Sequence, residues 1–468
     1  MKVLLTVHQF FPEFTAGTEV LTLSVARELL RRGHEVHVYT GHPADEGLLE
    51  DERFDEYEFE GIHVYRFHHA YVPMDGQASL IEVGYDNRLA AVHFEKILQS
   101  FKPDVVHFFH LNRLGTRLIE KANLAGIPAF ITLTDFWLIC PTAQLLLPDG
   151  KLCNGPNHYA GNCVKHLAQS TQRGLSSIAA KWMPMVLVNL LAKLTLSGFL
   201  PAYPNHAEVK AIGVRLRTNI SRLNRLKMIF APTGMMRDVL IMNGVDPGLI
   251  VESAYGVDAQ ESNSSPLPRI PRQLYRIGYI GTLARHKGCH VLIEAFKTLP
   301  WKCAVLKIYG NPDDFPDYSN GLKSLAAGHD SIEFSGTFPN SRISQVLADL
   351  DVLVVPSIWH ENTPLVIYSS QAARCPVVAS DLRGISEVIV SEENGLLFEP
   401  GNAAALRRQL LRLIDEPSLA SRLSANAKHP KGTSTYVDEL LYLWKAGGTA
   451  GETVVGLPQM RNVEQGPD

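Results

Sequence analysis

The run ENTP, which begins at Glu361, combines a carboxylate with the signals of a helix start. A polar residue followed by Pro364 favours a helix that begins at the proline, and the backbone N–H groups at such an end have no partner within the helix. An anion can therefore bind there, while the carboxylate of Glu361 can accept hydrogen bonds from hydroxyls. These residues indicate a ligand that carries both phosphates and hydroxyls.

A second charged cluster lies in the segment GTLARHKG, where Arg285 and Lys287 stand between an expected strand that begins at Arg276 and an expected helix. Basic side chains at a helix start again indicate a phosphate. Each cluster also has a simpler interpretation, because a lone lysine is commonly a solvated surface charge and Glu361 by itself could be a helix cap. The two clusters together favour a site for phosphate and sugar.

A third group contains Cys140, Cys153, Cys163 and His166, in a segment with little periodicity of its own. Three thiolates and an imidazole suit a structural zinc ion, and the CxxH spacing lets two of them reach one ion. A long loop also gains from such a local staple. The spacing matches no standard zinc finger, however, and Cys140 sits in an apolar run that could belong to a core. A structural zinc site and plain packing both stay open.

Alternating strands and helices must hold these groups in place. We expect a strand over Val3–Val7, a helix over Thr18–Arg32 and a strand over Val36–Tyr39. The apolar run from Pro376 to Ala379 is typical of a strand that is buried on both faces. Such alternation predicts α/β domains with parallel sheets, and 468 residues are enough for two sizeable cores.

Three segments, in order along the chain, resemble the retaining sugar-nucleotide glycosyltransferases of family 4. The opening run MKVLLTVHQFFPEFTAGTEV is similar to that family's first strand, Gly-rich loop and first helix, and the run from PDVVHFFH to TLTDFW is similar to its acceptor-side strand, helix and strand. The segments 276–300 and 358–398 are similar to its donor-binding half. The resemblance implies an α/β fold with two Rossmann-like, doubly wound domains that face a cleft (GT-B), and a C-terminal helix that returns to the N-terminal domain.

The expected domains follow from this resemblance and from local composition. Residues 1–258 form an acceptor-binding domain with a loop-rich insertion at 138–210, and a polar, Pro-rich linker at 259–273 leads to a sugar-nucleotide-binding domain at 274–429. Residues 430–445 form the C-terminal helix. Residues 446–468 are Gly-rich and weakly apolar, and we expect a disordered tail.

The resemblance implies transfer of a hexose from a nucleotide-diphosphate sugar with retention, and catalytic roles for Glu361, Lys287 and Arg285. The two basic residues would face the diphosphate, whose charge grows as the sugar becomes oxocarbenium-like, and catalysis requires no metal cofactor. Glu361 would hold hydroxyls of the donor sugar. The other expected donor-binding residues are Gly17, Thr18, Gly281, Thr282, Asn362, Thr363, Pro364, Leu365 and Ser369.

Two positions depart from the family pattern. Ser369 stands where relatives usually have a second Glu for the ribose, and a hydroxyl supplies no charge. Thr134 stands where a His often precedes the residue equivalent to Asp135, so that Asp135 or His110 could serve as the base on the acceptor side. A satisfied core position is nevertheless the more common state of a histidine such as His110. Because the leaving phosphate is thought to accept the acceptor's proton in this family, the change need not abolish activity.

Composition and apolar segments limit the classes of partner that the protein can have and its location in the cell. A formal net charge of -4 argues against a general nucleic-acid binder, and the apolar run at the start is too short for a signal peptide, so we expect a cytoplasmic protein. The most apolar window runs from Trp182 to Pro201, but polar residues such as Lys193 interrupt it and argue against a spanning helix. A buried helix and an interfacial helix on the inner membrane face are equally compatible with it. The interfacial helix would imply a lipid-linked glycan as acceptor, in place of another cell-surface glycan precursor.

Two other functions stay open. A degenerate family member could bind a sugar nucleotide or glycan without turnover, which Thr134 and Ser369 would permit. A dinucleotide-dependent oxidoreductase or epimerase would also open with a strand, a loop and a helix. The run AGTE lacks the three-glycine fingerprint of such enzymes, however, and no acidic ribose partner stands clearly at the end of the next strand.

Overall fold

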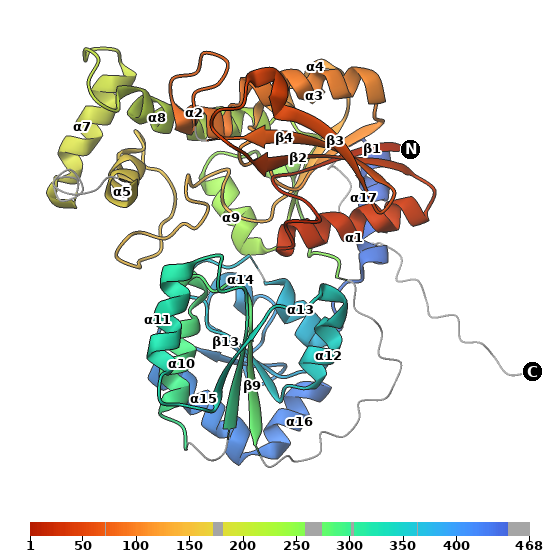
Figure 1. Cartoon of the computed structure of the whole chain (residues 1–468), viewed down its shortest axis with the longest axis vertical. Coiled ribbons are helices and arrows are strands. Elements are labelled where there is room, and N and C mark those ends of the chain that lie inside the picture. Colours follow the sequence, from red (N-terminus) through yellow and green to blue (C-terminus); the bar gives the residue numbers. More distant parts are fainter. Residues whose placement is uncertain (71, 172–180, 258–273, 301–303, 363, 448–468) are drawn as a thin grey trace, which may run out of the picture.

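The computed structural model describes residues 1–447 apart from 71, 172–180, 258–273, 301–303 and 363. Two sheets form separate domains, each with helices packed against it (Figure 1). The linker expected at 259–273 and the tail from 448 onward lie outside the described residues. The α/β fold with two Rossmann-like domains is confirmed.

The N-terminal sheet has the strand order β3-β4-β2-β1-β5-β6-β7-β8, and only the β3–β4 pair is antiparallel. Its strands are β1 (Lys2–Val7), β2 (Glu35–Pro43), β3 (Phe54–Phe59), β4 (Ile62–His69), β5 (Val105–Phe108), β6 (Ala129–Thr132), β7 (Met228–Ala231) and β8 (Ile250–Glu252). The helices are α1 (Gly17–Arg31), α2 (Leu80–Tyr85), α3 (Arg88–Phe101), α4 (Arg117–Leu124), α5 (Gly161–Thr171), α7 (Met185–Leu196), α8 (His206–Leu223) and α9 (Gly234–Met242), with short 3₁₀ turns at Glu50–Arg53 and Pro247–Leu249. The expected strand, helix and strand at the start of the chain are confirmed to within a few residues at each end.

The C-terminal sheet is parallel throughout, in the order β11-β10-β9-β12-β13-β14. Its strands are β9 (Tyr275–Ile280), β10 (Ala304–Tyr309), β11 (Ile332–Gly336), β12 (Val352–Val355), β13 (Val377–Ser380) and β14 (Leu396–Phe398). The helical elements are η3 (Arg285–Lys287), α10 (Cys289–Lys297), α11 (Pro316–Ala326), η4 (Asn340–Arg342), α12 (Ile343–Ala348), α13 (Leu365–Ala372), α14 (Arg383–Ser386), α15 (Ala403–Asp415), α16 (Pro417–Ala425) and α17 (Thr433–Lys445).

The short strands of both sheets are mostly apolar because both faces of each sheet are covered. Every residue of β5, β6, β7, β12 and β13 is buried. In β1, Leu4 belongs to the core that includes α3 and α4, while Val3 and Leu5 belong to the core that includes α1 and α17. Burial on both faces explains why these strands lack polar alternation.

The C-terminal helix α17 packs on the N-terminal domain beside α1, as Figure 1 shows. Its Trp444 Nε1 donates a hydrogen bond to His107 Nδ1 at 3.2 Å, and the other ring nitrogen of His107 lies 2.9 Å from the hydroxyl of Thr132. The Thr132 hydroxyl in turn lies 2.7 Å from the hydroxyl of Tyr436. The predicted return of this helix to the first domain is therefore confirmed.

The segment between β6 and β7 adds a helical projection to the first domain, where α5, α7 and α8 meet around an apolar cluster (Figure 1). Val188 and Ala192 of α7 face this cluster, whereas Val186, Leu187 and Leu190 are exposed. Within the described residues, the structure contains no helix that is both long and apolar enough to cross a membrane.

Candidate functional site

Glu361 is the buried centre of the site, just beyond the end of β12. Its side chain accepts hydrogen bonds from Ser357 Oγ at 2.6 Å and from Trp359 Nε1 at 2.7 Å. Lys287 Nζ lies 2.8 Å from Oε1 and 3.1 Å from Oε2, and it also lies over the ring of Trp359. Burial alone raises the pKa of Glu361, but the charge of Lys287 and the three donors outweigh it and hold the pKa below its ordinary value. Glu361 is therefore a carboxylate at neutral pH.

Two glycines allow the backbone to close around Glu361. A Cβ on Gly288 would lie 1.8 Å from the carbonyl oxygen of Pro356, and the φ of Gly288 is +73°. A Cβ on Gly384 would lie 1.8 Å from the carbonyl oxygen of Glu361 itself. No side chain fits at such separations, so glycine is required after η3 and in α14 where they pack against the loop after β12 that carries Glu361.

The residues after Glu361 lead into α13. The helix begins at Leu365, one residue later than expected, because Pro364 has an extended ψ of 130° and forms the N-cap. Thr363 lies outside the described residues. Ser369 lies one turn into the helix, and its hydroxyl donates to the carbonyl of Leu365 at 3.2 Å.

Asn362 points toward the N-terminal domain. Its Nδ2 donates to the hydroxyl of Tyr255 at 3.1 Å, and its Oδ1 accepts from Thr233 Oγ1 at 3.2 Å. These bonds use the side chain as an interdomain contact beside Glu361. The expected role in donor binding stays a prediction.

The remaining residues of the second domain lie around η3. Arg285 is exposed, and within the described residues no carboxylate lies within salt-bridge distance of it. Gly281 and Thr282 follow β9, and the carbonyl of Thr282 accepts a hydrogen bond from the Tyr279 hydroxyl at 2.8 Å. Arg285 is thus available to a solvent-side anion, while Thr282 shapes the loop through its backbone.

The Gly17 loop of the first domain faces α13 of the second. A Cβ on Gly17 would lie 3.5 Å from Leu365 Cδ1, so the starts of α1 and α13 are in van der Waals range of each other. Ala16 is the N-cap of α1 and supplies no side-chain cap, and Thr18 follows in the first turn. Two helix N-termini from different domains therefore meet beside Glu361, which favours an anion there.

The loops that follow β5 and β6 place the predicted acceptor-side residues together. His110 Nε2 lies 2.9 Å from Asp135 Oδ2, and His110 Nδ1 accepts from the backbone N–H of Asn112. The Thr134 hydroxyl donates to the carbonyl of Phe109 at 3.3 Å. His110 is therefore a satisfied, buried histidine that is paired with a carboxylate.

Two residues of this region were missed by the sequence-based prediction. His8 follows β1 directly, and its ring centroid lies 4.1 Å from that of His110. Glu19 in the first turn of α1 is buried, with Oε1 at 3.6 Å from His8 Nε2. Burial raises the pKa of Glu19 to about 6, and Glu19 Oε2 and His8 Nδ1 lack hydrogen-bond partners within the described residues. The sequence contained one signal that could have found these two residues: His8 directly precedes the Gly17 loop region and Glu19 directly follows it.

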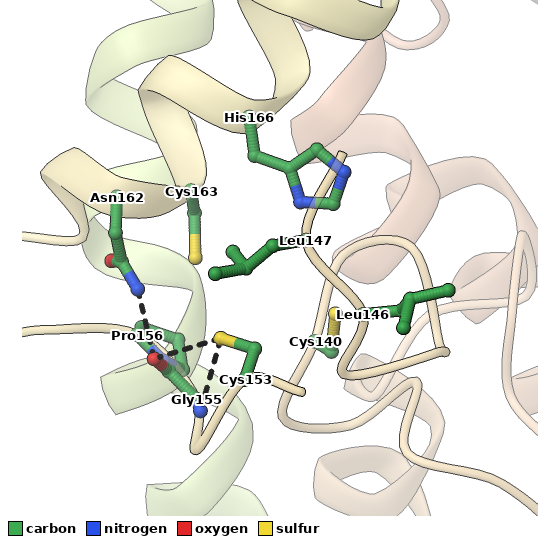
Figure 2. A pocket seen from close by; sticks show the side chains of 9 residues that line it. All are labelled: Cys140, Leu146, Leu147, Cys153, Gly155, Pro156, Asn162, Cys163 and His166. Atoms are coloured by element: carbon green, nitrogen blue, oxygen red, sulfur yellow. Dashed lines mark hydrogen bonds between the residues drawn. The ribbon is translucent and has the colours of Figure 1, made fainter. Parts of the chain in front are cut away.

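The four residues predicted to bind a metal line one cavity of ≈ 10 Å³, which Figure 2 shows from close by. Cys140 follows β6, Cys153 lies in the next loop, and Cys163 and His166 lie on α5. As they stand, no three His, Cys, Asp or Glu side chains within the described residues are arranged to hold a metal ion.

Two family models match this chain. The model described as "Glycosyltransferase Family 4" matches residues 15–169, and the model described as "Glycosyl transferases group 1" matches residues 263–429. These ranges contain the Gly17 loop and the Lys287–Glu361 pair, respectively.

Similar proteins bear names of the same class. The D-inositol 3-phosphate glycosyltransferase of Thermomonospora curvata is 30% identical over 40% of this chain and 47% of its own length. The phosphatidyl-myo-inositol mannosyltransferase of Mycobacterium leprae is 28% identical over 44% of this chain and 55% of its own length. The chain thus spans about half the length of the curated relatives it matches.

Solved structures match over nearly the whole chain. The Anabaena protein HepE in complex with UDP and glucose has a TM-score of 0.62 at 16% identity. The match covers 95% of this chain and 100% of the HepE chain. Sucrose-phosphate synthase from Thermosynechococcus elongatus also has a TM-score of 0.62 at 16% identity, and the match covers 96% of each chain. These likenesses show the two-domain GT-B fold. The two family models, one in each domain, show that the chain belongs to the family 4 glycosyltransferases.

Proposed function

We propose that this protein transfers a hexose from a nucleotide-diphosphate sugar to a glycan or lipid-linked glycan acceptor, with retention at the anomeric carbon. The observation that carries the proposal is the ion pair between Lys287 and the buried carboxylate of Glu361, beside the start of α13. Lys287 Nζ lies within hydrogen-bond distance of both carboxylate oxygens, and since an ammonium has three donors, at least one is left for a phosphate oxygen. The support from relatives is that HepE was solved with UDP and glucose.

The proposed reaction breaks the bond between the anomeric carbon and the phosphate oxygen and forms a bond to the acceptor oxygen. Lys287, Arg285 and the starts of α1 and α13 would stabilise the negative charge that develops on the leaving diphosphate. Glu361 would accept hydrogen bonds from hydroxyls of the donor sugar. The acceptor's proton would pass to a phosphate oxygen, so no side-chain base is required.

The acceptor hydroxyl would lie on the side of His110 and Asp135. The Asn362–Tyr255 bond ties the donor loop to the first domain, and the Tyr255 hydroxyl donates to the carbonyl of Leu133, close to Asp135 in the chain. These contacts support an acceptor position between Glu361 and the His110–Asp135 pair.

Donor binding is tested by thermal unfolding against UDP-, GDP-, ADP- and dTDP-sugars. We expect one donor to raise the Tm of the wild type, and we expect Lys287→Ala and Glu361→Gln to lose that shift. Lys323→Ala is the matched control, because Lys323 is an exposed lysine on α11 of the same domain. NMR of the product's anomeric centre then checks retention, and an inverted product would overturn that part of the proposal.

A binding role without turnover is the alternative that two observations favour. The hydroxyls of Ser369 and Thr134, the two departures from the family pattern, both donate to backbone carbonyls. A Tm shift with a donor but no transfer to any glycan acceptor would support this alternative. Absence of a shift with every nucleotide sugar would contradict both functions.

We propose further that the protein acts at an anionic membrane surface on the cytoplasmic face, where a lipid-linked acceptor would lie. The support is a patch of exposed apolar side chains around α7, in which Trp182, Val186 and Phe199 are 78%, 77% and 80% exposed. Lys181 and Lys193 are exposed in the same segment and suit anionic lipid heads. Figure 1 places α7 at the outer end of the helical projection.

Sedimentation with vesicles tests this surface. We expect binding to vesicles that contain phosphatidylglycerol, and weaker binding to phosphatidylcholine alone or after a combined Trp182→Ser and Phe199→Ser change. Leu124→Ser is the matched control, because Leu124 on α4 is 77% exposed but lies outside the patch. Equal binding by the patch variant and the control would count against the membrane role.

A further inference from the structure

The walls of the small cavity in Figure 2 carry three thiols and an imidazole that the proposed reaction does not use. They come from three separate parts of the chain: Cys140 after β6, Cys153 in the following loop, and Cys163 with His166 on α5. Cys163 and His166 are three residues apart on the helix and so lie on one face of it. Four side chains of the types that bind metal ions thus line one cavity, and the proposed reaction does not account for them.

The loop around Cys153 holds the sulfur against the backbone of Gly155, whose carbonyl lies 3.6 Å from it. The backbone N–H of Gly155 donates to Cys153 Sγ at 3.4 Å, and Gly155 has a φ of +110°, which favours glycine. Asn162 Nδ2 donates to the carbonyl of Gly155 at 2.9 Å and so ties this turn to α5, which carries Cys163. The turn therefore presents the sulfur of Cys153 toward the cavity with a donor behind it.

A buried positive charge lies near the thiols without a carboxylate partner. Arg215 of α8 is 3% exposed, and its guanidinium donates to the carbonyls of Trp137 and Ile139, directly before Cys140. Within the described residues no Asp or Glu lies within salt-bridge distance of Arg215. Burial lowers the pKa of Arg215 to about 10, and negative charge on Cys140 or Cys163 would oppose that effect. An uncompensated buried charge is costly, so this arginine favours an anionic neighbour.

Free reactive thiols do not fit this environment. Cys140 and Cys163 are buried, and Cys153 is half-buried. Catalytic and redox-sensing cysteines have lowered pKa values and are accessible. Three thiols that line one cavity together with an imidazole suit a bound cation better than a reactive role.

We propose that Cys140, Cys153, Cys163 and His166 bind one structural zinc ion. Three thiolates, a neutral imidazole and Zn²⁺ carry a net charge of minus one, which the guanidinium of Arg215 balances. The three thiols release their protons on binding. Because the four side chains do not yet stand in ligating geometry, binding requires side-chain rotation and withdrawal of Leu147, which extends among them in Figure 2.

The ion would cross-link the long segment between β6 and α5 to the helical projection. That segment carries Asp135 and also Gln144, whose Nε2 lies 3.4 Å from His286 Nδ1 in the loop of Lys287. Apart from one isolated bridge between Leu146 and Leu152, it contains no described strand. A cross-link here would hold the segment that carries Asp135 and Gln144 against the loop of Lys287.

Elemental analysis of the full chain, purified without chelator, is the first test. We expect one zinc per wild-type chain, and near-zero zinc in Cys153→Ser and in Cys163→Ser. Cys289→Ser is the matched control, because Cys289 is a buried thiol of the second domain and should leave the zinc content unchanged. Zinc that persists in both ligand variants, or iron in place of zinc, would overturn the assignment.

Replacement of the metal in the wild-type protein by cobalt shows whether three thiolates bind it, even if the variants fail to fold. A tetrahedral site with three thiolates should give d–d bands and sulfur-to-cobalt charge-transfer bands, and a thiol-specific mercurial should release one metal ion. A wild-type protein that lacks metal and takes up no cobalt would refute the site. So would a disulfide between two of the three cysteines in the purified protein.

Discussion

At the scale of the residue, the candidate site depends on one ion pair, in which a half-buried lysine faces a buried carboxylate. Glu361 is 3% exposed, and its carboxylate is satisfied by Lys287, Ser357 and Trp359. Removing the charge of Lys287 leaves the carboxylate of Glu361 buried without its cation, which typically costs about 3–5 kcal/mol. Neutral but isosteric changes, such as Glu361→Gln, therefore separate binding from folding better than truncation does.

Close backbone approach at Gly288 leads to the first prediction. Ala at Gly288 must adopt a φ of +73° and meet the carbonyl of Pro356 at 1.8 Å, whereas Ala at Gly328 must adopt a φ of +80° in open space. Both changes carry the left-handed penalty of about 1–2 kcal/mol, but only Gly288→Ala should abolish the donor-induced Tm shift. Thermal unfolding of both variants checks this, and an equal loss of donor binding would show that the clash is not the cause.

The buried carboxylate of Glu19 leads to a pH-dependent prediction. Because the pKa of Glu19 is raised to about 6 from 4.5, the folded protein keeps a proton between these pH values that the unfolded chain releases. The contribution of Glu19 to stability therefore falls as pH rises through this window, by a total of about 2 kcal/mol. We expect Glu19→Gln to raise the Tm at pH 8 and to leave it nearly unchanged at pH 4.

Glu28 on the same helix provides the control of opposite sign. Its hydrogen bond to Arg31 is the largest cause that lowers the pKa of Glu28 to about 2, so its stabilising contribution is present above 4.5 and is lost as pH falls toward 2. Glu28→Gln should therefore lower the Tm at pH 8. Equal Tm changes for Glu19→Gln at both pH values would mean that ionisation of Glu19 is not responsible.

At the scale of the element, α17 links the two ends of the chain. A buried chain of hydrogen bonds runs from Trp444 through His107 and Thr132 to Tyr436. Burial lowers the pKa of His107 to about 3, so the ring is neutral and can accept from Trp444 while it donates to Thr132. The helix is thus fixed on the first domain by polar bonds as well as by apolar packing.

Two tyrosines of α17 test this network. Tyr436 is buried and bonded to Thr132, whereas Tyr442 is 61% exposed. We expect Tyr436→Phe to lower the free energy of unfolding by about 1–2 kcal/mol, because the buried Thr132 hydroxyl loses a partner. Tyr442→Phe should have no measurable effect. Chemical denaturation of both variants measures the difference, and equal stabilities would argue against the network.

At the scale of the whole molecule, α9 of the first domain is capped by the second. The backbone N–H groups of Gly234 and Met235 each donate to the carboxylate of Glu387 at 2.8 Å, and Arg383 pairs with Asp238 of α9. With the Asn362–Tyr255 bond, these contacts hold the two domains in the arrangement that brings Gly17 to Leu365. A negative side chain at a helix N-terminus is stabilising, so Glu387 should favour this arrangement.

Loss of this cap should open the molecule. We expect Glu387→Ala to increase the radius of gyration measured by small-angle X-ray scattering and to weaken donor binding severalfold, because fewer molecules occupy the competent arrangement. Glu392→Ala is the matched control, since Glu392 pairs with Arg412 within the second domain. An unchanged radius for Glu387→Ala would indicate that other contacts hold the domains.

Local patterns were enough to predict the α/β fold, the two domains and the charged clusters at Lys287 and Glu361. Strand and helix periodicity are properties of neighbouring residues, so they can be seen in the sequence before folding. The start of α13 was missed by one residue, because the ψ of Pro364 depends on how the loop packs. Apolar composition around Trp182 was equally compatible with burial and exposure, since a helix's surroundings are not part of its own sequence.

The sequence by itself determined which residue types stand at the ends of strands and helices, and therefore the chemistry available to this protein. Only the tertiary structure decided which of them meet: Lys287 with Glu361, Gly17 with Leu365, and Asn362 with the first domain. The raised pKa of Glu19, and the lack of a hydrogen-bond partner for His8 Nδ1 among the described residues, also result from burial in the folded protein. Contacts between residues far apart in the chain are set by how the domains pack, and local sequence carries no direct record of that packing.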